Sequence, residues 1–208
     1  MTDTAPTTRL PAARRRKQLL DVSLEVFAER GFHPTSMNDL AEAAGVTKPV
    51  LYQHFGSKRA LYQELLDDVA ATLETRIHEA TATTSPRSQV EAGFRAYFTF
   101  VAERRSRFTL LFGSRARRDA EFAGTVTRLE ASVAEWVASL IDADIDDAHR
   151  RTLAYGIVGL AEATSRQWVT GALDLDPEEL TAQAADLAWK GLRGVERLPS
   201  PPGRAQPS

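Results

Sequence analysis

Side chains suited to an anionic partner gather in the short stretch VTKPVLYQHFGSK, which ends at Lys58. Tyr52 and His54 can donate hydrogen bonds to phosphate oxygens, and Lys58 follows a glycine with a full positive charge. At about 100° per residue, a helix through this stretch brings Leu51 and Phe55 together on one side, where they would face a core. The stretch therefore predicts a short helix that is anchored by its apolar side and holds its polar side outward.

The polar side of this short helix has a centre and two edges. Tyr52 and His54 lie at the edges, and the centre is made of Pro49, Val50 and Gln53. This layout fits the major groove of DNA, where central side chains meet base edges and flanking ones reach the phosphates of both strands. Val50 could contact a thymine methyl group, and Gln53 and Lys48 have donors for base edges. The alternative is that the edge residues are packing residues and the following lysine is a solvated charge.

A second short helix is predicted immediately before this one, across the turn AEAAGVTK. Ser36 can cap its start with Asp39 three residues on, and its apolar positions follow at helical spacing: Met37, Leu40, Ala41 and Ala44. Gly45 can form the turn, and Thr47 can cap the helix beyond it. Two short helices joined by a tight glycine turn are typical of a helix-turn-helix, whose second helix enters the major groove.

The charge distribution points to the same end of the chain. The net charge is -2, but residues 1–60 hold nine Lys and Arg against six Asp and Glu, a local charge of +3 that leaves -5 for the remainder. The basic third suggests a local anionic partner. Its densest run, from Arg14 to Lys17, would contact phosphate or the minor groove, or else would be a solvated start of the first helix.

Nearly every other segment shows helical spacing and none shows a sustained alternation, which predicts an all-α protein. A first helix is expected from about Ala12 to Arg30. A long helix is expected over residues 58–80, with an apolar side chain at every fourth position: Leu61, Leu65, Val69, Leu73 and Ile77. Further helices follow the polar break TATTSPRSQ, and the last should begin with Asp176 as its cap and Pro177 in its first position.

The segment GFHPTSMNDLAEAAGVTKPVLYQHFGSKRALYQEL resembles the N-terminal DNA-binding domain of the tetracycline-repressor (TetR) family. The shared pattern runs from a Gly-aromatic turn through a Thr-rich helix start, AGV, LY.HF and SK..L, and covers about residues 12–65. The resemblance implies phosphate contacts by Thr35, Ser36, Tyr52, His54 and Lys58. It implies base-facing positions for Thr47, Lys48, Pro49, Val50 and Gln53.

The same resemblance implies an N-terminal three-helix helix-turn-helix domain followed by a larger helical ligand-binding and dimerisation domain. We expect the DNA-binding domain over residues 12–57 and the larger domain over 58–197, with helix 58–80 as the linker. The arm over 1–11 and the tail over 198–208, which is rich in proline, are expected to be disordered. The partners implied are a palindromic double-stranded operator, a small-molecule effector and a second copy of the chain, joined through the last two helices.

Aromatic side chains beyond residue 90 lie on predicted helices that could enclose an apolar cavity for that effector. The candidates for its lining are Phe94, Phe98, Phe108, Phe112, Trp136, Tyr155 and Trp168. Each could equally be ordinary core, and the arginines from Arg104 to Arg118 could meet an anionic effector or be solvated. Small residues such as Gly156, Gly159 and Gly191 suit close packing of helices between two copies.

Catalysis has little support in the sequence. The four histidines are scattered, without HExxH spacing, and there is no Gly-rich phosphate loop and no GxSxG. We therefore expect no catalytic residue, no metal site and no cofactor. The absence of cysteine, of a signal peptide and of any apolar run approaching about 18 residues predicts a cytoplasmic protein.

The sequence thus favours a ligand-responsive transcriptional regulator, most simply a repressor that a small molecule releases from its operator. Two alternatives stay open. One is a helical small-molecule-binding protein or enzyme whose N-terminal helices merely pack. The other is a protein that coats DNA without sequence preference.

Overall fold

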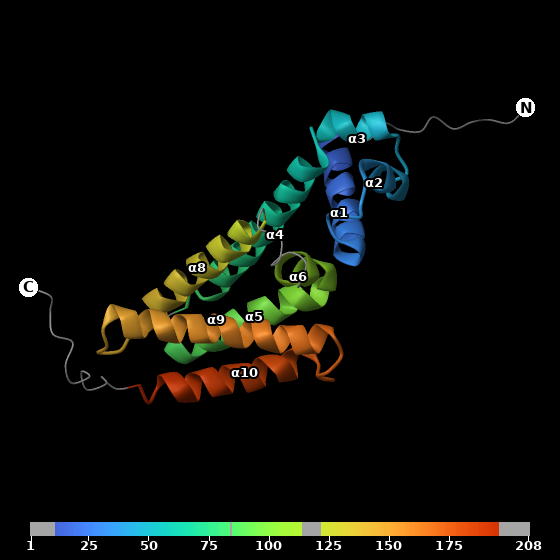
Figure 1. The fold of residues 1–208 in the computed structure, drawn as a ribbon. Coiled ribbons are helices and arrows are strands. Elements are labelled where there is room, and N and C mark those ends of the chain that lie inside the picture. The colour runs from blue at the N-terminus through green and yellow to red at the C-terminus, as the bar shows by residue number, and fades with distance from the viewer. Residues whose placement is uncertain (1–10, 84, 114–121, 196–208) are drawn as a thin grey trace, which may run out of the picture. The chain divides into compact units, whose positions relative to one another are not determined.

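The computed structural model describes residues 11–83, 85–113 and 122–195, and over these ranges it contains helices and no strand. The chain divides into two compact units, whose helices are labelled in Figure 1. The first unit joins residues up to Thr72 to the segment Arg104–Val126, and the second joins Leu73–Glu103 to the residues from Thr127 onward. The predicted all-α fold class is confirmed. The disorder predicted for residues 1–11 and 198–208 concerns residues outside the described ranges, except for Pro11, which is the N-cap of α1.

The first unit is built around three helices and parts added from further along the chain. It contains α1 (Ala12–Arg30), α2 (Met37–Ala43), α3 (Lys48–His54), the start of α4 (Lys58–Ala80) and α6 (Arg105–Phe112). α1 packs against α2 and α6, and α2 packs against α3. The bounds that hydrophobic spacing predicts for α1 and α4 are confirmed.

Local signals in the sequence fix the ends of the short helices. Gly31 ends α1 at a φ of 86°, and Gly45 makes the turn after α2 at a φ of 64°, a region that side chains disfavour. The predicted cap of α2 is confirmed as a capping box, in which Ser36 accepts from the backbone of Asp39 and the Asp39 carboxylate accepts from the backbone of Ser36. These turns set the directions of α1, α2 and α3.

An aromatic cluster forms the floor of the first unit. The ring of Tyr62, on α4, lies 4.9 Å from Phe27 of α1, 5.0 Å from Phe32 in the following turn, and 4.5 Å from Phe122, centroid to centroid. Tyr62 is buried together with its neighbours Leu61 and Leu65. The rings of Phe27 and Phe122 meet Tyr62 edge to face and that of Phe32 is tilted against it, so α1, its turn and α4 are held in one packed group.

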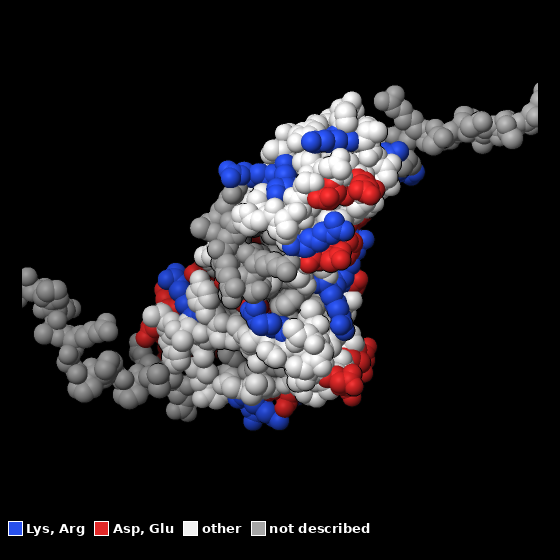
Figure 2. All heavy atoms as spheres, turned by 45° about the vertical axis from the view of Figure 1, so that its right-hand side comes forward, with Lys and Arg blue, Asp and Glu red and all other residues white. Residues whose placement is uncertain are grey.

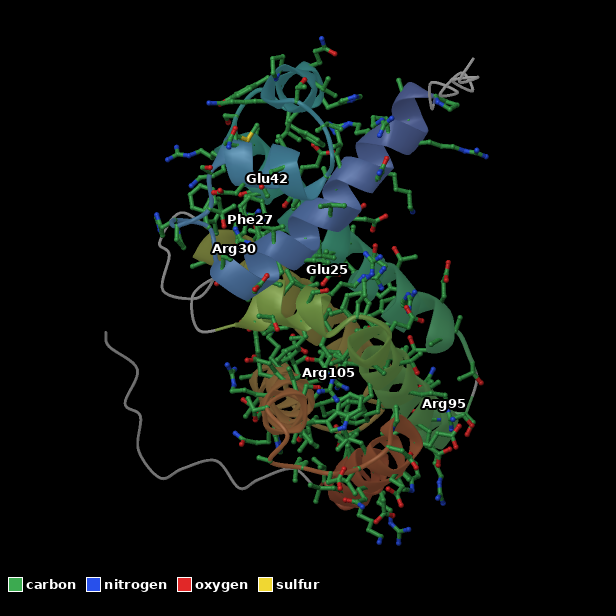
Figure 3. The ribbon with its side chains drawn as sticks, turned by 90° about the vertical axis from the view of Figure 1, so that its right-hand side faces the viewer. Glu25, Phe27, Arg30, Glu42, Arg95 and Arg105 are labelled. Carbon is green, nitrogen blue, oxygen red and sulfur yellow. The ribbon has the colours of Figure 1, made fainter. Side chains whose placement is uncertain are left out.

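Polar contacts attach α6 to α1. The guanidinium of Arg104 lies 2.6 Å from the carboxylate of Asp21, and the Ser106 hydroxyl donates to Glu25 at 2.9 Å. Glu25 is labelled on α1 in Figure 3. α6 therefore groups with the N-terminal helices, and the compact unit differs from the predicted division at residue 57. Hydrophobic spacing carries no information on contacts between helices so far apart in sequence.

The second unit contains the rest of α4 together with α5 (Pro86–Glu103), most of α8 (Ala123–Leu140), α9 (Asp147–Val169) and α10 (Pro177–Leu192). α5 and α9 both pack against α10, and α5 also packs against α9. Alanines line the approach between α8 and α9: Ala134, Ala138 and Ala154. The predicted start of the last helix is confirmed, with Asp176 as a capping-box residue and Pro177 in the first turn.

Arg150 closes the end of α8. Its guanidinium donates to the backbone carbonyls of Ile141, Ala143 and Ile145, which lie between α8 and α9. These groups have no helical partner, so the arginine satisfies carbonyls that the end of a helix leaves open. Of the helices in the described ranges, none is long and apolar enough to cross a membrane.

Candidate nucleic-acid interface

The short helix α3 presents one polar face and buries the other. Leu51 is fully buried and the following Phe55 is 3% exposed, whereas Tyr52 is 45% exposed and Gln53 is also at the surface. Lys48 is exposed as well, with its ammonium 6.0 Å from the ring of Tyr52. The division between core anchors and an outward face is therefore the one that the helical spacing predicts. What these outward side chains contact on DNA stays a prediction.

The remaining base-facing candidates lie at or near the start of α3. Thr47 is exposed and its hydroxyl makes no capping bond to the helix, so it is available to a ligand. Pro49 is exposed and Val50 is partly exposed. All five candidates therefore lie on the accessible side of α3 or its cap, where a helix-turn-helix makes its base contacts.

Arg16 supports the far end of α3. Its guanidinium carbon lies 4.5 Å from the centroid of the Phe55 ring, and one of its nitrogens lies 2.8 Å from the carboxylate of Glu64 on α4. The arginine thus joins α1, the end of α3 and α4. Within the basic run, Arg14 and Lys17 stay exposed and Arg15 bonds to Gln18.

Two of the phosphate candidates are engaged inside the protein. The side chain of Thr35 is buried, and its hydroxyl donates to the carbonyl of Gly31 at 2.7 Å. The structure therefore does not support a phosphate contact by that side chain, because the hydroxyl already ties the turn to the end of α1. The ammonium of Lys58 likewise donates to backbone carbonyls of the same turn. A family resemblance assigns roles to side chains by position alone and carries no information on these local hydrogen bonds.

Ser36 and His54 keep a place at the surface. The Ser36 hydroxyl is occupied by the capping box with Asp39, so its capping role is shown and a phosphate contact stays a prediction. His54 is partly exposed in the last turn of α3. Hydrogen bonds from the side chain and backbone of Ser36, with the nearby charge of Arg30, lower the pKa of Asp39 below its ordinary value. Asp39 is therefore ionised near neutral pH, at the positive end of α2.

The charge on the first unit is mixed. The face in Figure 2 carries Lys and Arg side chains beside Asp and Glu, with uncharged areas between them. An evenly basic coat, the pattern of a protein that binds any DNA, is not seen on this face. Lys48 is one of the exposed cations of the first unit.

The aromatic residues predicted to line an effector cavity divide between the units. Phe94, Phe98 and Trp168 are buried in the second unit, and the Phe98 and Trp168 rings lie 6.3 Å apart. Trp136 is partly buried there and donates to the Thr81 hydroxyl at 2.9 Å. The remaining pair, Phe108 and Phe112, is buried on α6 in the first unit.

Tyr155 differs from the other aromatic candidates, and its place in an effector cavity stays a prediction. Its side chain is 48% exposed on α9, so it faces away from the packed interior. Aromatic character alone does not tell a buried position from a bare helix face. Among the arginines between 104 and 118, those at 115, 117 and 118 lie outside the described residues.

A polar group lies inside the second unit, on the same helices as the predicted aromatic residues Phe94, Phe98 and Trp168. The hydroxyls of Tyr97 and Ser165 are buried on α5 and α9, where Ser165 lies near enough to act on the Tyr97 hydroxyl, and neither has another hydrogen-bond partner within the described residues. Burial is the main cause that raises the pKa of Tyr97. Beside them, Glu162 is 9% exposed and pairs with Arg166. The helical register of Glu162 and Ser165 with Trp168 was the available signal for this group.

A surface groove of about 360 Å³ lies between α5 and α10 in the second unit. Its walls include Arg87, Arg95, Glu178 and Trp189, and Figure 3 labels Arg95 on α5. None of the predicted lining residues takes part in it. Nor do the described residues contain a group of three or more His, Asp or Glu that could hold a metal ion.

Two family models match the chain. One, described as "Bacterial regulatory proteins, tetR family", matches residues 19–65, and the other, "Tetracyclin repressor-like, C-terminal domain", matches residues 86–191. The transcriptional activator FasR of Mycolicibacterium smegmatis is 34% identical over 190 residues, which cover 90% of this chain and 87% of FasR. The transcriptional repressor KstR2 of the same organism is 30% identical over 158 residues, 74% of this chain and 77% of KstR2.

Solved structures show the same similarity. A TetR-like transcriptional regulator from Rhodococcus sp. RHA1 matches with a TM-score of 0.75 and 29% identity, over 90% of this chain and all of that one. The similarity therefore extends across both compact units and is not confined to the helix-turn-helix.

Proposed function

The chain belongs to the tetR family of bacterial regulatory proteins, and on that premise we propose that α3 reads a palindromic operator under the control of a small molecule. The family and its relatives are DNA-binding transcriptional regulators that respond to ligands. The observation that carries the proposal is the division of α3 into buried anchors and an exposed polar face. A packing helix also exposes polar side chains, but an aromatic ring left 45% exposed at Tyr52, beside an exposed Lys48, suits a helix with an external partner.

Roles on DNA follow from position on that face. We assign base contacts to the side chains at its start and centre: Thr47, Lys48, Pro49, Val50 and Gln53. Tyr52 and His54 flank them and would donate to phosphates, with Ser36 adding a contact at the start of α2. Thr35 is left out because its hydroxyl is buried and bonded to Gly31.

We propose that a second copy covers bare parts of α9 and α10, since members of this family are dimeric. Leu187 on α10 is 61% exposed and Tyr155 on α9 is 48% exposed, unusual values for large apolar side chains. At Gly156 and Gly159 an added Cβ would meet no atom within 4 Å, so the surface there is open to a close neighbour. A two-fold dimer would present two α3 helices to half-sites spaced by about 34 Å or a multiple of it.

The effector is proposed to bind among the helices of the second unit, next to Phe94, Phe98 and Trp168. These side chains are apolar and buried, and the hydroxyls of Tyr97 and Ser165, buried on the same two helices, could make polar contacts with a ligand. A largely apolar molecule with a neutral oxygen would suit that mixture. We propose that the protein represses transcription. KstR2 is named a repressor, whereas FasR is named an activator.

The decisive experiment selects duplexes from a random pool with the full chain and measures affinity at several salt concentrations. A regulator enriches a palindrome, binds it far more tightly than scrambled DNA, and loses affinity steeply as salt rises. Equal affinity for scrambled DNA would establish the nonspecific alternative. No enrichment at any salt concentration would leave the small-molecule-binding alternative.

A further inference from the structure

Lys58 carries a charge that DNA could use, yet its ammonium is already engaged. It lies 2.7 Å from the carbonyl oxygen of Thr35, 2.8 Å from that of Phe32 and 3.3 Å from that of His33. An ammonium has three N–H donors, so three acceptors use its whole capacity. A phosphate could bind here only if one of these bonds were given up.

The three carbonyls belong to the turn between α1 and α2. Gly31 ends α1 in a left-handed conformation, and the backbone beyond it has left the helix with carbonyls that need donors. Lys58 reaches them from a position more than twenty residues further along the chain. The Thr35 hydroxyl closes the same turn from the inside by its bond to Gly31.

This turn determines where the helix-turn-helix begins. Thr35 directly precedes Ser36, the N-cap of α2, and α2 packs against α3. A shift of the turn would move the capping box first and the support beneath α3 next. The ammonium of Lys58 therefore acts on the recognition helix at a distance, through backbone that it holds in place.

The lysine is itself held firmly. Its ammonium lies 4.3 Å from the centroid of the Phe32 ring, and Phe32 belongs to the aromatic cluster with Tyr62. Lys58 is also the first residue of α4, where the positive end of a helix disfavours a cation. The bonds to three carbonyls and the contact with the Phe32 ring together offset the cost of a cation at the start of α4.

We propose that Lys58 is a positioning residue of the recognition unit and does not neutralise a DNA phosphate. The inference rests on the DNA-reading role proposed above for α3. Loss of a phosphate contact and displacement of the turn between α1 and α2 would both weaken DNA binding. They differ in the salt dependence of binding, in the stability of the variant protein and in the effect of a charge-preserving substitution.

The first test is Lys58→Ala in the full chain, with Lys17→Ala as the matched control. Lys17 is an exposed cation of α1, so its loss removes the same charge without touching the turn. We expect Lys58→Ala to bind a palindrome selected by the wild-type protein at least tenfold more weakly, with an unchanged slope of log K against log salt. Its Tm should fall by about 5 °C, while that of the control stays within about 1 °C.

The second test is Lys58→Arg, which keeps the charge but replaces a compact ammonium with a planar fork. A phosphate contact would survive this change. The three carbonyls converge on one point, so a planar guanidinium cannot bond to all of them at once. We expect Lys58→Arg to lose most of the affinity that Lys58→Ala loses. Wild-type affinity and Tm in Lys58→Arg, together with a slope shallower by about 1.8 for a Lys58→Ala dimer, would overturn the proposal.

Hydrogen exchange provides a readout that needs no DNA. Residues 32–39 should exchange faster in both variants than in wild type, while the centre of α1 stays as protected as before. Unchanged exchange across this segment in Lys58→Ala would refute the positioning role, and Lys58→Arg provides the same readout if Lys58→Ala is globally destabilised. If the wild-type protein selects no DNA, the proposed function fails, and the exchange result still decides the role of Lys58.

Discussion

At the scale of single residues, the face of α3 separates groups that hold the protein on DNA from groups that choose the sequence. Tyr52 is exposed at the edge of that face, with Lys48 near its ring. We expect Tyr52→Phe to weaken binding to the selected palindrome and to scrambled DNA by similar factors, about tenfold for each bond to a charged acceptor that the dimer loses. Fluorescence anisotropy on both duplexes measures this. A loss confined to the palindrome would make Tyr52 a base reader.

Gln53 should behave in the opposite way. Its amide lies at the centre of the exposed face, where a bond to a base edge discriminates by about 1–3 kcal/mol. We expect Gln53→Ala to relax the preference at one base pair of each half-site and to leave scrambled-DNA affinity nearly unchanged. Repeating the selection with the variant would reveal the relaxed position. An unchanged selected sequence would remove Gln53 from the base-facing set.

The pKa of Asp39 gives the start of α2 a pH dependence with a definite sign. Its pKa is lowered in the folded protein because Ser36 donates to the carboxylate, so the ionised form stabilises the fold. That contribution is present above the ordinary pKa of an aspartate, about 3.9, and is lost as pH falls through the lowered folded value. In urea unfolding, wild type should exceed Asp39→Asn in stability at pH 7, and the difference should shrink by pH 3. An equal difference at both pH values would contradict this assignment.

At the scale of helices, the sequence specifies most of what is local. The ends of α1 and α4, the capping box of α2 and the start of α10 follow from spacing, caps and glycines that lie within a few residues of one another. The grouping of α6 with α1 joins segments far apart in the chain, as the pair Arg104 and Asp21 shows, whose members are 83 residues apart. The hydrophobic spacing within a helix does not identify the helix against which it packs.

The same limit applied to the candidate site. The helical wheel sorted α3 correctly into buried and exposed sides, because both sides belong to one helix. It could not reveal that Thr35 is buried or that Lys58 turns to backbone carbonyls, since both depend on the path of the turn. Nor could it reveal that Tyr155 is exposed, because an apolar stripe looks the same in sequence whether it packs on the chain's own core or faces outward.

The N-cap of α10 offers a test of element stability. Asp176 accepts from the backbone of Glu178 and Glu179, both at 2.8 Å, and lies at the surface. We expect Asp176→Ala to lower the free energy of unfolding by about 1 kcal/mol, the usual value of such a cap. Asp174→Ala, an exposed change two residues earlier, should stay within about 0.5 kcal/mol. Equal losses of stability from the two substitutions would show that the Asp176 cap does not stabilise α10.

At the scale of the whole molecule, the bare apolar positions make a prediction about assembly. Leu187→Asp should yield a folded monomer, because the side chain is 61% exposed and contributes little to its own chain's core. Sedimentation should show the change, and palindrome affinity should fall toward that of scrambled DNA. Ala182→Asp is the control, since Ala182 is exposed on another side of α10. A Leu187→Asp protein that sediments as a dimer would rule out this face.

The continuous helix α4 limits how the molecule can be taken apart. It begins in the first unit and ends in the second, and it supplies buried side chains to both: Leu61 and Leu65 before the division, Leu73 and Ile77 after it. The first unit also needs α6, which the chain provides only after α5. A gene fragment that stops at residue 57 therefore encodes α3 without α4 and α6, which complete the packing of the first unit. Grafting this head onto another protein would need residues from both sides of α5, so it is not a modular unit of the chain.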